Sequence, residues 1–200
     1  MPIRAVIFDI GGVLVRTEDL EPRRKWERRF GLPEWGLANL VFGNPVAMRA
    51  MIGQAPTEAI WAEVARQLSL ASAELADLRE DFWKGDRLDH DLLAFIRTLR
   101  PRYKTGVLSN AWPGARRYHQ GRLDGDTFDT LVFSAEEGLA KPDPEIYRRA
   151  LGRLNVSAPE AVFVDDFIEN VEAARGLGMR GVHFQPGINV RAEFEKLEIA

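Results

Sequence analysis

Four segments that lie far apart in the chain each place a polar side chain directly after an apolar run. In the first segment, the run Val6–Phe8 leads into Asp9, and the glycines Gly11 and Gly12 follow. Ligands of open α/β sheets bind outside the carboxyl ends of the strands, so a carboxylate at this position could face a ligand. An isolated aspartate before glycines can also simply cap a turn, so Asp9 is a candidate catalytic group that needs support from the other segments.

The second and third segments carry groups that suit a phosphate. Ser109 and Asn110 follow the apolar pair 107–108, and a hydroxyl and an amide are good hydrogen-bond partners for phosphate oxygens. Lys141 precedes Pro142, which disfavours helical backbone at the lysine and keeps it extended, where its ammonium can meet an anion. Serine and asparagine are also common in turns, and most loop lysines are simply solvated. Neither segment is decisive alone.

The fourth segment is the most informative one. Asp165 and Asp166 are adjacent at the end of the apolar run Val162–Val164, and Asn170 follows. Two neighbouring carboxylates repel each other unless they share a cation or one of them is protonated. Ligands that are all oxygen suit a hard cation such as Mg²⁺. We therefore expect a metal site here rather than a purely structural pair.

The elements that must position these groups form a parallel sheet. The chain contains five short apolar runs, at Ile3–Phe8, Thr105–Leu108, Thr130–Phe133, Ala161–Val164 and Gly181–Phe184. Short runs of this kind are typical of strands buried on both faces. From residue 105 onward they alternate with helical patterns at 143–154, 168–177 and 190–198, as in βα units. All four polar segments would then meet at one edge of the sheet, and together they match the needs of phosphoryl transfer.

Residues 16–88 have a different pattern, with helical periodicity and no convincing strand. Thr57 is a suitable N-cap for one helix, Ser72 begins a second, and the basic run at 23–29 indicates a third. The inner side of the second helix is expected to carry Leu75, Leu78, Phe82 and Trp83. The sequence thus predicts an α/β fold: a Rossmann-like, three-layer parallel-sheet core (1–15 and 89–200) with an inserted all-helical cap (16–88).

The composition excludes several classes of function. The 200 residues include 30 acidic and 27 basic side chains, for a net charge of −3, which argues against a dedicated nucleic-acid binder. Cysteine is absent, so disulfides, thiolate zinc sites and a cysteine nucleophile are excluded. No targeting signal or membrane span is evident, which predicts a cytoplasmic protein. The oligomeric state has no signal in the sequence.

The four segments occur in an order that resembles the haloacid dehalogenase superfamily of hydrolases with a helical cap, over almost the whole chain. The stretch Lys141–Tyr147, together with Val164–Asp166 and Asn170, is similar to the branch that contains bacterial α-glucose-1-phosphate phosphatases and the phosphatase domain of soluble epoxide hydrolase.

This resemblance implies a role for each site residue. Asp9 would attack phosphorus and form an aspartyl-phosphate. Ser109 and Asn110 would hold the transferring group, while Lys141 would neutralise it and orient Asp9. The implied Mg²⁺ ligands are Asp9, Asp166, the backbone carbonyl of Gly11 and, in support, Asp165 and Asn170. The implied substrate is a small phosphorylated metabolite, with a sugar phosphate as one candidate.

Gly11 departs from the pattern of most phosphatases of this superfamily, which carry a second aspartate there as general acid and base. The loss of a positioned acid typically costs ~10²–10⁴-fold in rate. A hexose 1-phosphate would suffer less, because its hemiacetal oxygen is a better leaving group than a simple alcohol, and the resembling glucose-1-phosphate phosphatases also have glycine at this position. Two alternatives stay open: a 2-haloacid dehalogenase-like hydrolase, against which the pair at 165–166 argues, and a catalytically weak member that binds a phosphorylated ligand.

Three further features of the sequence give weaker indications of function. The basic run of Arg23, Arg24, Lys25, Arg28 and Arg29 could attract a phosphorylated substrate, although a solvated helix face explains it as well. Trp112 follows Ser109 and Asn110 closely enough to border the site. His119 could lie near the same crevice, although its spacing to the other histidines does not suggest a metal ligand.

Overall fold

A computed structural model describes residues 1–123 and 126–199. Its five-stranded sheet is parallel throughout and has the strand order β5-β4-β1-β6-β7. The strands are β1 (Ala5–Phe8), β4 (Lys104–Ser109), β5 (Thr130–Phe133), β6 (Ala161–Asp165) and β7 (Arg180–His183). All five predicted strands are present, each within two residues of its predicted bounds, and the predicted α/β fold is confirmed.

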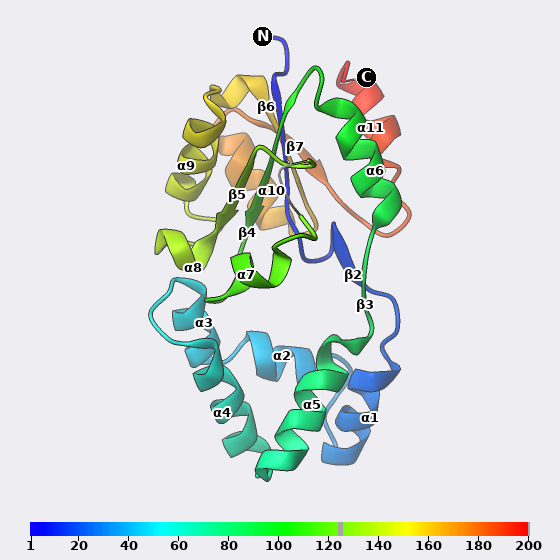
Figure 1. The fold of residues 1–200 in the computed structure, drawn as a ribbon, viewed down its shortest axis with the longest axis vertical. Coiled ribbons are helices and arrows are strands. Elements are labelled where there is room, and N and C mark those ends of the chain that lie inside the picture. The colour runs from blue at the N-terminus through cyan, green and yellow to red at the C-terminus, as the bar shows by residue number, and fades with distance from the viewer. Residues whose placement is uncertain (124–125, 200) are drawn as a thin grey trace.

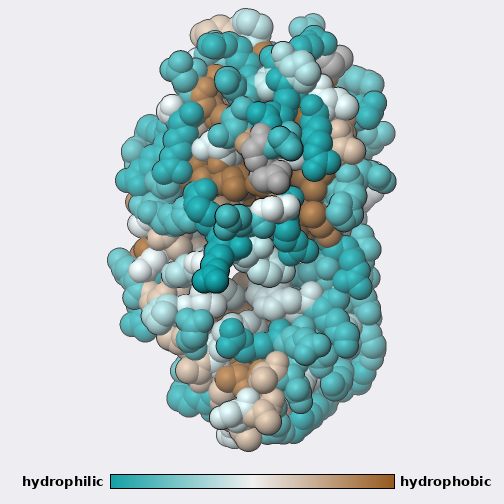
Figure 2. Space-filling model, viewed as in Figure 1, coloured by the Kyte–Doolittle hydropathy of each residue, from teal (hydrophilic) through white to brown (hydrophobic). Residues whose placement is uncertain are grey.

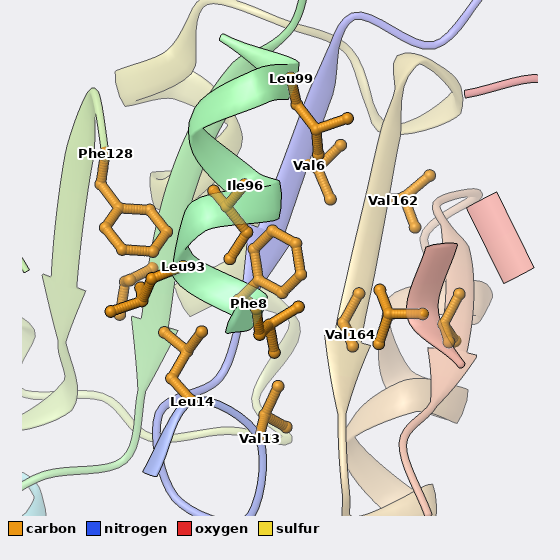
Figure 3. Close-up of a cluster of buried hydrophobic side chains, with 14 of the residues drawn as sticks. Val6, Phe8, Val13, Leu14, Leu93, Ile96, Leu99, Phe128, Val162 and Val164 are labelled. Carbon is orange, nitrogen blue, oxygen red and sulfur yellow. The ribbon is translucent and has the colours of Figure 1, made fainter. Parts of the chain in front are cut away.

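Helices cover both faces of this sheet (Figure 1). One face packs against α6 (His90–Leu99) and α11 (Val190–Lys196), and the other against α9 (Pro144–Leu154) and α10 (Ile168–Gly176). The side chains of β1 alternate between the two layers, as the pleat of a strand requires. Val6 and Phe8 join the first layer, whose packing Figure 3 shows, while Ala5 and Ile7 join the second. The sheet is therefore buried on both sides and presents polar groups only at its edges and strand ends.

Two short helices and one 3₁₀ turn complete this part of the chain. They are α7 (Ala115–His119), α8 (Ser134–Glu137) and the 3₁₀ turn Ala158–Glu160. The predicted helices at 143–154, 168–177 and 190–198 correspond to α9, α10 and α11, with ends that differ by one or two residues.

Five further helices lie beyond the carboxyl ends of the sheet strands (Figure 1), and we call them the helical unit. They are α1 (Glu21–Phe30), α2 (Gly36–Phe42), α3 (Pro45–Met51), α4 (Thr57–Leu68) and α5 (Ser72–Lys84). They bury a hydrophobic cluster of their own, which contains Trp26, Leu37, Val41, Trp61, Val64, Leu78 and Phe82. The three predicted helices correspond to α1, α4 and α5, whereas α2 and α3 have only seven residues each and were not predicted.

The prediction that residues 16–88 hold no strand is wrong. The strands β2 (Val15–Thr17) and β3 (Asp86–Leu88) form an antiparallel ribbon at the two ends of the helical unit. Thr17 Oγ1 donates a hydrogen bond to Asp86 Oδ1 over 2.7 Å, and the Arg23 guanidinium lies 2.9 Å from the same oxygen. Three residues are too few to show strand periodicity, so this ribbon depends on side-chain partners that the sequence pattern does not reveal.

Two expectations inside the helical unit are also corrected. Thr57 is not the N-cap of α4, because Pro56 occupies that position and the Thr57 hydroxyl donates to the Pro113 carbonyl over 2.8 Å. Trp83 does not lie inside with Leu78 and Phe82, because it is 40% exposed. It lies in the last turn of α5, which ends at Lys84, and the chain turns at Gly85.

The basic run on α1 is paired within the chain. Its partners are Asp86 for Arg23, Glu34 for Arg24, Asp81 for Lys25, Glu21 for Arg28 and Glu74 for Arg29. Arg23 is buried and the other four side chains are exposed. Because all five charges are paired within the chain, they do not favour the interpretation as a substrate attractor. The face of the molecule in Figure 2 is mostly hydrophilic. No helix in the described part of the chain combines the length and the apolarity that a membrane crossing needs.

Candidate active site

Asp9 is the first residue after β1, the central strand of the sheet. Its backbone N–H donates to the Val164 carbonyl over 2.9 Å, which ties it to the neighbouring strand β6. Its Oδ1 accepts a hydrogen bond from the backbone N–H of Ile10 over 2.7 Å. The residue is buried. The carboxylate is therefore fixed in one orientation at the carboxyl edge of the sheet, as the sequence predicted for its position.

Lys141 reaches this carboxylate from the loop before α9. Its Nζ lies 2.9 Å from Asp9 Oδ1 and 2.6 Å from Asp165 Oδ2, and its side chain is only 1% exposed. Burial by itself would lower the pKa of this ammonium, but the charges of the two carboxylates outweigh it and raise the pKa. Lys141 is thus a buried, permanently charged link between two aspartates.

Asn110 holds the backbone of this lysine. Its Nδ2 donates to the Lys141 carbonyl over 2.9 Å, and its Oδ1 accepts from the Lys141 N–H over 2.8 Å. The structure thus places this amide on the lysine backbone. The predicted role of Asn110 in holding phosphate stays a prediction.

Asp165 and Asp166 are adjacent but have opposite environments. Asp165 is fully buried, and its oxygens accept hydrogen bonds from Lys141, from the Phe167 N–H over 2.8 Å and from Asn170 Nδ2 over 3.0 and 3.1 Å. Tyr147 in turn donates its hydroxyl to the Asn170 carbonyl over 2.9 Å. Protein donors therefore occupy both oxygens of Asp165.

Asp166 has an oxygen that the described residues leave without a partner. Its Oδ1 is buried and accepts no hydrogen bond from residues 1–123 or 126–199. A Cβ on Gly12 would lie 2.0 Å from Asp166 Oδ2, and Gly12 has a φ of +71°, so only glycine allows the carboxylate to lie this close to the backbone. Burial, followed by the charges of Asp9 and Asp165, raises the pKa of Asp166 to about 7.

The three aspartates form a cluster that a divalent cation would fit. Asp9, Asp165 and Asp166 each offer a carboxylate oxygen, and these oxygens lie within 4.8 Å of one another. Burial raises the pKa of Asp9 despite the opposing charge of Lys141. The single positive charge of Lys141 does not neutralise three carboxylates. The buried, unpaired oxygen of Asp166 therefore indicates a site for a cation. The donor set is all oxygen, which suits Mg²⁺.

Ser109 is the last residue of the adjacent strand β4. The register pairs Phe8 with Val107. Ser109 therefore lies one residue further along the strand direction than Asp9, and it is buried. The loop after it is fixed by Ser134, a residue that the sequence reasoning missed. Ser134 Oγ accepts from the Ala111 N–H over 2.9 Å and lies 3.1 Å from the Ala111 carbonyl. A serine directly after the β5 run was the available signal.

The surroundings of Gly11 and His119 differ: Gly11 borders open space, and His119 packs against an aromatic ring. A Cβ on Gly11 would have no atom within 4 Å, so a side chain there would extend into open space. The ring of His119 stacks on Phe133 with 6.1 Å between the centroids. Burial, with a contribution from the charge of Arg122, lowers the pKa of His119 to about 4. The imidazole is therefore neutral at pH 7.

Comparisons with known proteins show the family and the fold of the chain. A family model described as haloacid dehalogenase-like hydrolase matches residues 3–178. A sesquiterpene phosphatase of Aspergillus oryzae is 28% identical over 97% of this chain and 96% of its own. A phosphorylated carbohydrates phosphatase of Thermotoga maritima is 30% identical over 90% of this chain and 84% of its own. Among solved structures, a haloacid dehalogenase family enzyme of Bacteroides thetaiotaomicron, in complex with magnesium and inorganic phosphate, superposes with a TM-score of 0.77. It is 19% identical and covers 96% of this chain and 99% of its own.

Proposed function

We propose that this chain, which belongs to the haloacid dehalogenase-like hydrolases, is a Mg²⁺-dependent phosphatase that acts on a small phosphorylated metabolite. Its phosphatase relatives support the reaction class, and its own site supports the mechanism. The observation that carries the proposal is the buried free oxygen of Asp166 beside the oriented carboxylate of Asp9.

Asp9 is the nucleophile of this mechanism. The Ile10 N–H and Lys141 hold its Oδ1, which leaves Oδ2 to attack phosphorus. The new bond joins Asp9 Oδ2 to phosphorus, while the bond from phosphorus to the substrate oxygen breaks and its electron pair goes to the leaving oxygen, which takes a proton from water. A water molecule then attacks the phosphorus of the aspartyl-phosphate, releases inorganic phosphate and regenerates the carboxylate.

Lys141 and Ser109 stabilise the transferring group. The Lys141 ammonium offsets the negative charge that builds up between Asp9 and the phosphoryl oxygens, and its burial strengthens that effect. We assign to the hydroxyl of Ser109, the last residue of the neighbouring strand β4, a hydrogen bond to a phosphoryl oxygen. Asn110 contributes by fixing the Lys141 backbone.

Asp9, Asp166 and the backbone carbonyl of Gly11 would hold Mg²⁺. We place Asp165 and Asn170 behind the metal site rather than in it, since the oxygens of Asp165 already accept from Lys141, Phe167 and Asn170. When bound, the ion supplies Lewis-acid polarisation of the phosphoryl group and screens its charge from that of Asp9. The helical unit would act as the cap that closes over this edge, and a cytoplasmic location fits such a metabolite enzyme.

Gly11 limits the choice of leaving group. Without an acid at this position, the substrate oxygen must leave with little help, so a stabilised leaving group is favoured. A sugar 1-phosphate satisfies that condition, but so do other esters. One phosphatase relative is named for carbohydrates and another for sesquiterpenes, so the relatives leave the substrate class open.

The test is hydrolysis of p-nitrophenyl phosphate with Mg²⁺, with EDTA and in the Asp9→Asn variant. We expect turnover only in the wild type with Mg²⁺. Turnover that persists in EDTA would overturn the metal dependence and favour a metal-independent chemistry like that of the 2-haloacid dehalogenases. Binding of phosphate without turnover in the wild type would instead favour the ligand-binding alternative that Gly11 suggests.

A further inference from the structure

Three aromatic side chains meet where the helical unit faces the core, and we call them the aromatic wall: Phe42, Trp83 and Trp112. The ring of Phe42 lies 5.4 Å from that of Trp112 and 6.0 Å from that of Trp83, and the two indoles are 6.3 Å apart. Phe42 ends α2 and Trp83 lies at the end of α5, whereas Trp112 comes from the core loop after β4. The wall therefore joins both parts of the molecule.

The wall lies close to the proposed phosphate site. Trp112 is three residues after Ser109, and three extended residues span at most about 11 Å. The residues that follow Ser109 are anchored, because Asn110 is hydrogen-bonded to the Lys141 backbone and Ala111 to Ser134. The backbone of Trp112 is therefore held within about 11 Å of that of Ser109.

The wall leaves apolar surface uncovered. Phe42 is 41% exposed and Trp83 is 40% exposed, although both contact other rings of the same cluster. Large aromatic surface of this kind costs free energy in water, at roughly 25 cal/mol per Å². An apolar group that covers these rings would recover part of that free energy.

Two polar side chains near the wall are already used by the backbone. Asn44, two residues after Phe42, donates to the Leu40 and Val41 carbonyls and accepts from the Ala47 N–H. The Thr57 hydroxyl donates to the Pro113 carbonyl. Both side chains are committed within the chain, and a ligand hydroxyl that they do not meet would lose hydrogen bonds to water.

We propose that the aromatic wall binds the leaving group of the substrate, and that this group is apolar. This inference rests on the proposed phosphatase function and specifies its substrate class: a phosphate monoester of an apolar alcohol rather than of a sugar, with aryl esters best suited to the leaving-group limit at Gly11. Phe42 and Trp83 then determine specificity and take no part in the chemical step.

The test compares three monoesters of primary alcohols, so that the leaving oxygens are alike: n-octyl phosphate, glucose 6-phosphate and methyl phosphate. With Mg²⁺ present, we expect kcat/KM for octyl phosphate to exceed that for methyl phosphate at least about tenfold, and glucose 6-phosphate to gain no comparable advantage. In Phe42→Gln and Trp83→Gln the ratio of octyl to methyl should fall severalfold. In Phe42→Leu and Trp83→Leu, which keep an apolar surface, it should fall less.

Trp35→Gln is the matched control. Trp35 is 49% exposed and precedes α2, whereas Phe42 ends that helix, so their Cα atoms are about 10 Å apart along the helix axis. The octyl-to-methyl ratio should not change in this variant. A ratio near one in the wild type, a preference for glucose 6-phosphate, or an equal fall in Trp35→Gln would overturn the proposal.

A binding measurement separates this proposal from the proposed reaction. Isothermal titration of the Asp9→Asn variant with octyl and methyl phosphate measures affinity without turnover. Octyl phosphate should bind more tightly than methyl phosphate, and Phe42→Gln should abolish this difference in affinity. Such a result supports the binding role of the wall even if no ester is hydrolysed. In that case only the proposed phosphatase function is rejected. Equal affinities for both esters reject the wall, whatever the turnover.

Discussion

The carboxyl edge of the sheet and the aromatic wall are linked by the short segment from Ser109 to Trp112 but are built in opposite ways. At the edge, charged groups are buried and hold each other: Lys141 lies between Asp9 and Asp165, and Asn170 completes the set. In the wall, apolar rings are exposed and two of them keep about two fifths of their surface in contact with water. We propose that the first arrangement fixes the reacting groups, as electrostatic catalysis requires. The second leaves apolar surface that an apolar ligand would cover.

The largest effect is expected from the substitution of Asp9. In Asp9→Asn the nucleophile is lost while the size of the side chain is kept. We expect kcat for p-nitrophenyl phosphate to fall by at least about 10⁴-fold, since covalent catalysis through this oxygen is no longer available. Steady-state assays with Mg²⁺ measure this. Residual activity within tenfold of the wild type would show that Asp9 is not the nucleophile.

The second prediction concerns the positive charge of Lys141, which lies between two buried carboxylates. Lys141→Met leaves two buried carboxylates without their cation, and a broken buried ion pair costs about 3–5 kcal/mol of unfolding free energy. Urea unfolding without Mg²⁺ measures the loss. Lys25→Met is the control, because Lys25 pairs with Asp81 at the surface and its side chain is 60% exposed. A similar loss in both variants would contradict the special role of the buried pair.

Adjacent glycines provide the third prediction. Gly11→Asp places a carboxyl in open space, where it can supply the missing acid and raise turnover of methyl phosphate by up to about 10²-fold, with less effect on p-nitrophenyl phosphate. Gly12→Ala, in contrast, puts a Cβ against Asp166 and should weaken Mg²⁺ binding, as measured by activity against Mg²⁺ concentration. Equal gains on both esters in Gly11→Asp would show that another group already supplies the proton.

A fourth prediction concerns the unsatisfied oxygen of the edge. If Asp166 binds Mg²⁺, saturating metal should stabilise the wild type by about 2–3 kcal/mol at a hundred times the dissociation constant. Asp166→Asn should lose most of this stabilisation. Thermal unfolding with and without Mg²⁺ measures it. A shift of equal size in Asp166→Asn would place the metal elsewhere.

The sequence predicted the edge far better than the wall, and the reason is physical. Asp9, Ser109 and Asp165 follow apolar strands whose continuous hydrophobicity is visible in the chain, and parallel strands must end on the same side. The different environments of Asp165 and Asp166 depend on Asn170 in α10 and on Gly12 in the loop after β1, and no local pattern predicts these contacts. The contact of the Asn110 amide with the Lys141 backbone was likewise not predictable from the sequence.

The wall and the ribbon β2–β3 depend on contacts between segments that no local pattern links. Trp83 has the helical spacing of a buried residue, and only the turn at Gly85 and the position of the core leave it exposed. Phe42 ends a helix of seven residues, too short for its periodicity to be recognised. Trp112 was predicted to border the site from its nearness to Ser109 alone, and that prediction motivates the experiments on the wall.

The smallest expected effect concerns a buried base outside the edge. Lys141 stays charged because two carboxylates face it, whereas His119 stacks on Phe133 near Arg122, and its pKa falls from the ordinary 6.5 to about 4. Between these two pH values the unfolded chain binds the additional proton. The unfolding free energy should therefore be complete above pH 6.5 and decrease as the pH falls towards 4, by roughly 1–2 kcal/mol after allowance for partial exposure. His119→Gln should remove that part of the slope in urea unfolding at pH 7, 5.5 and 4.5. An unchanged slope would mean that solvent reaches the imidazole and that burial alone does not decide its charge.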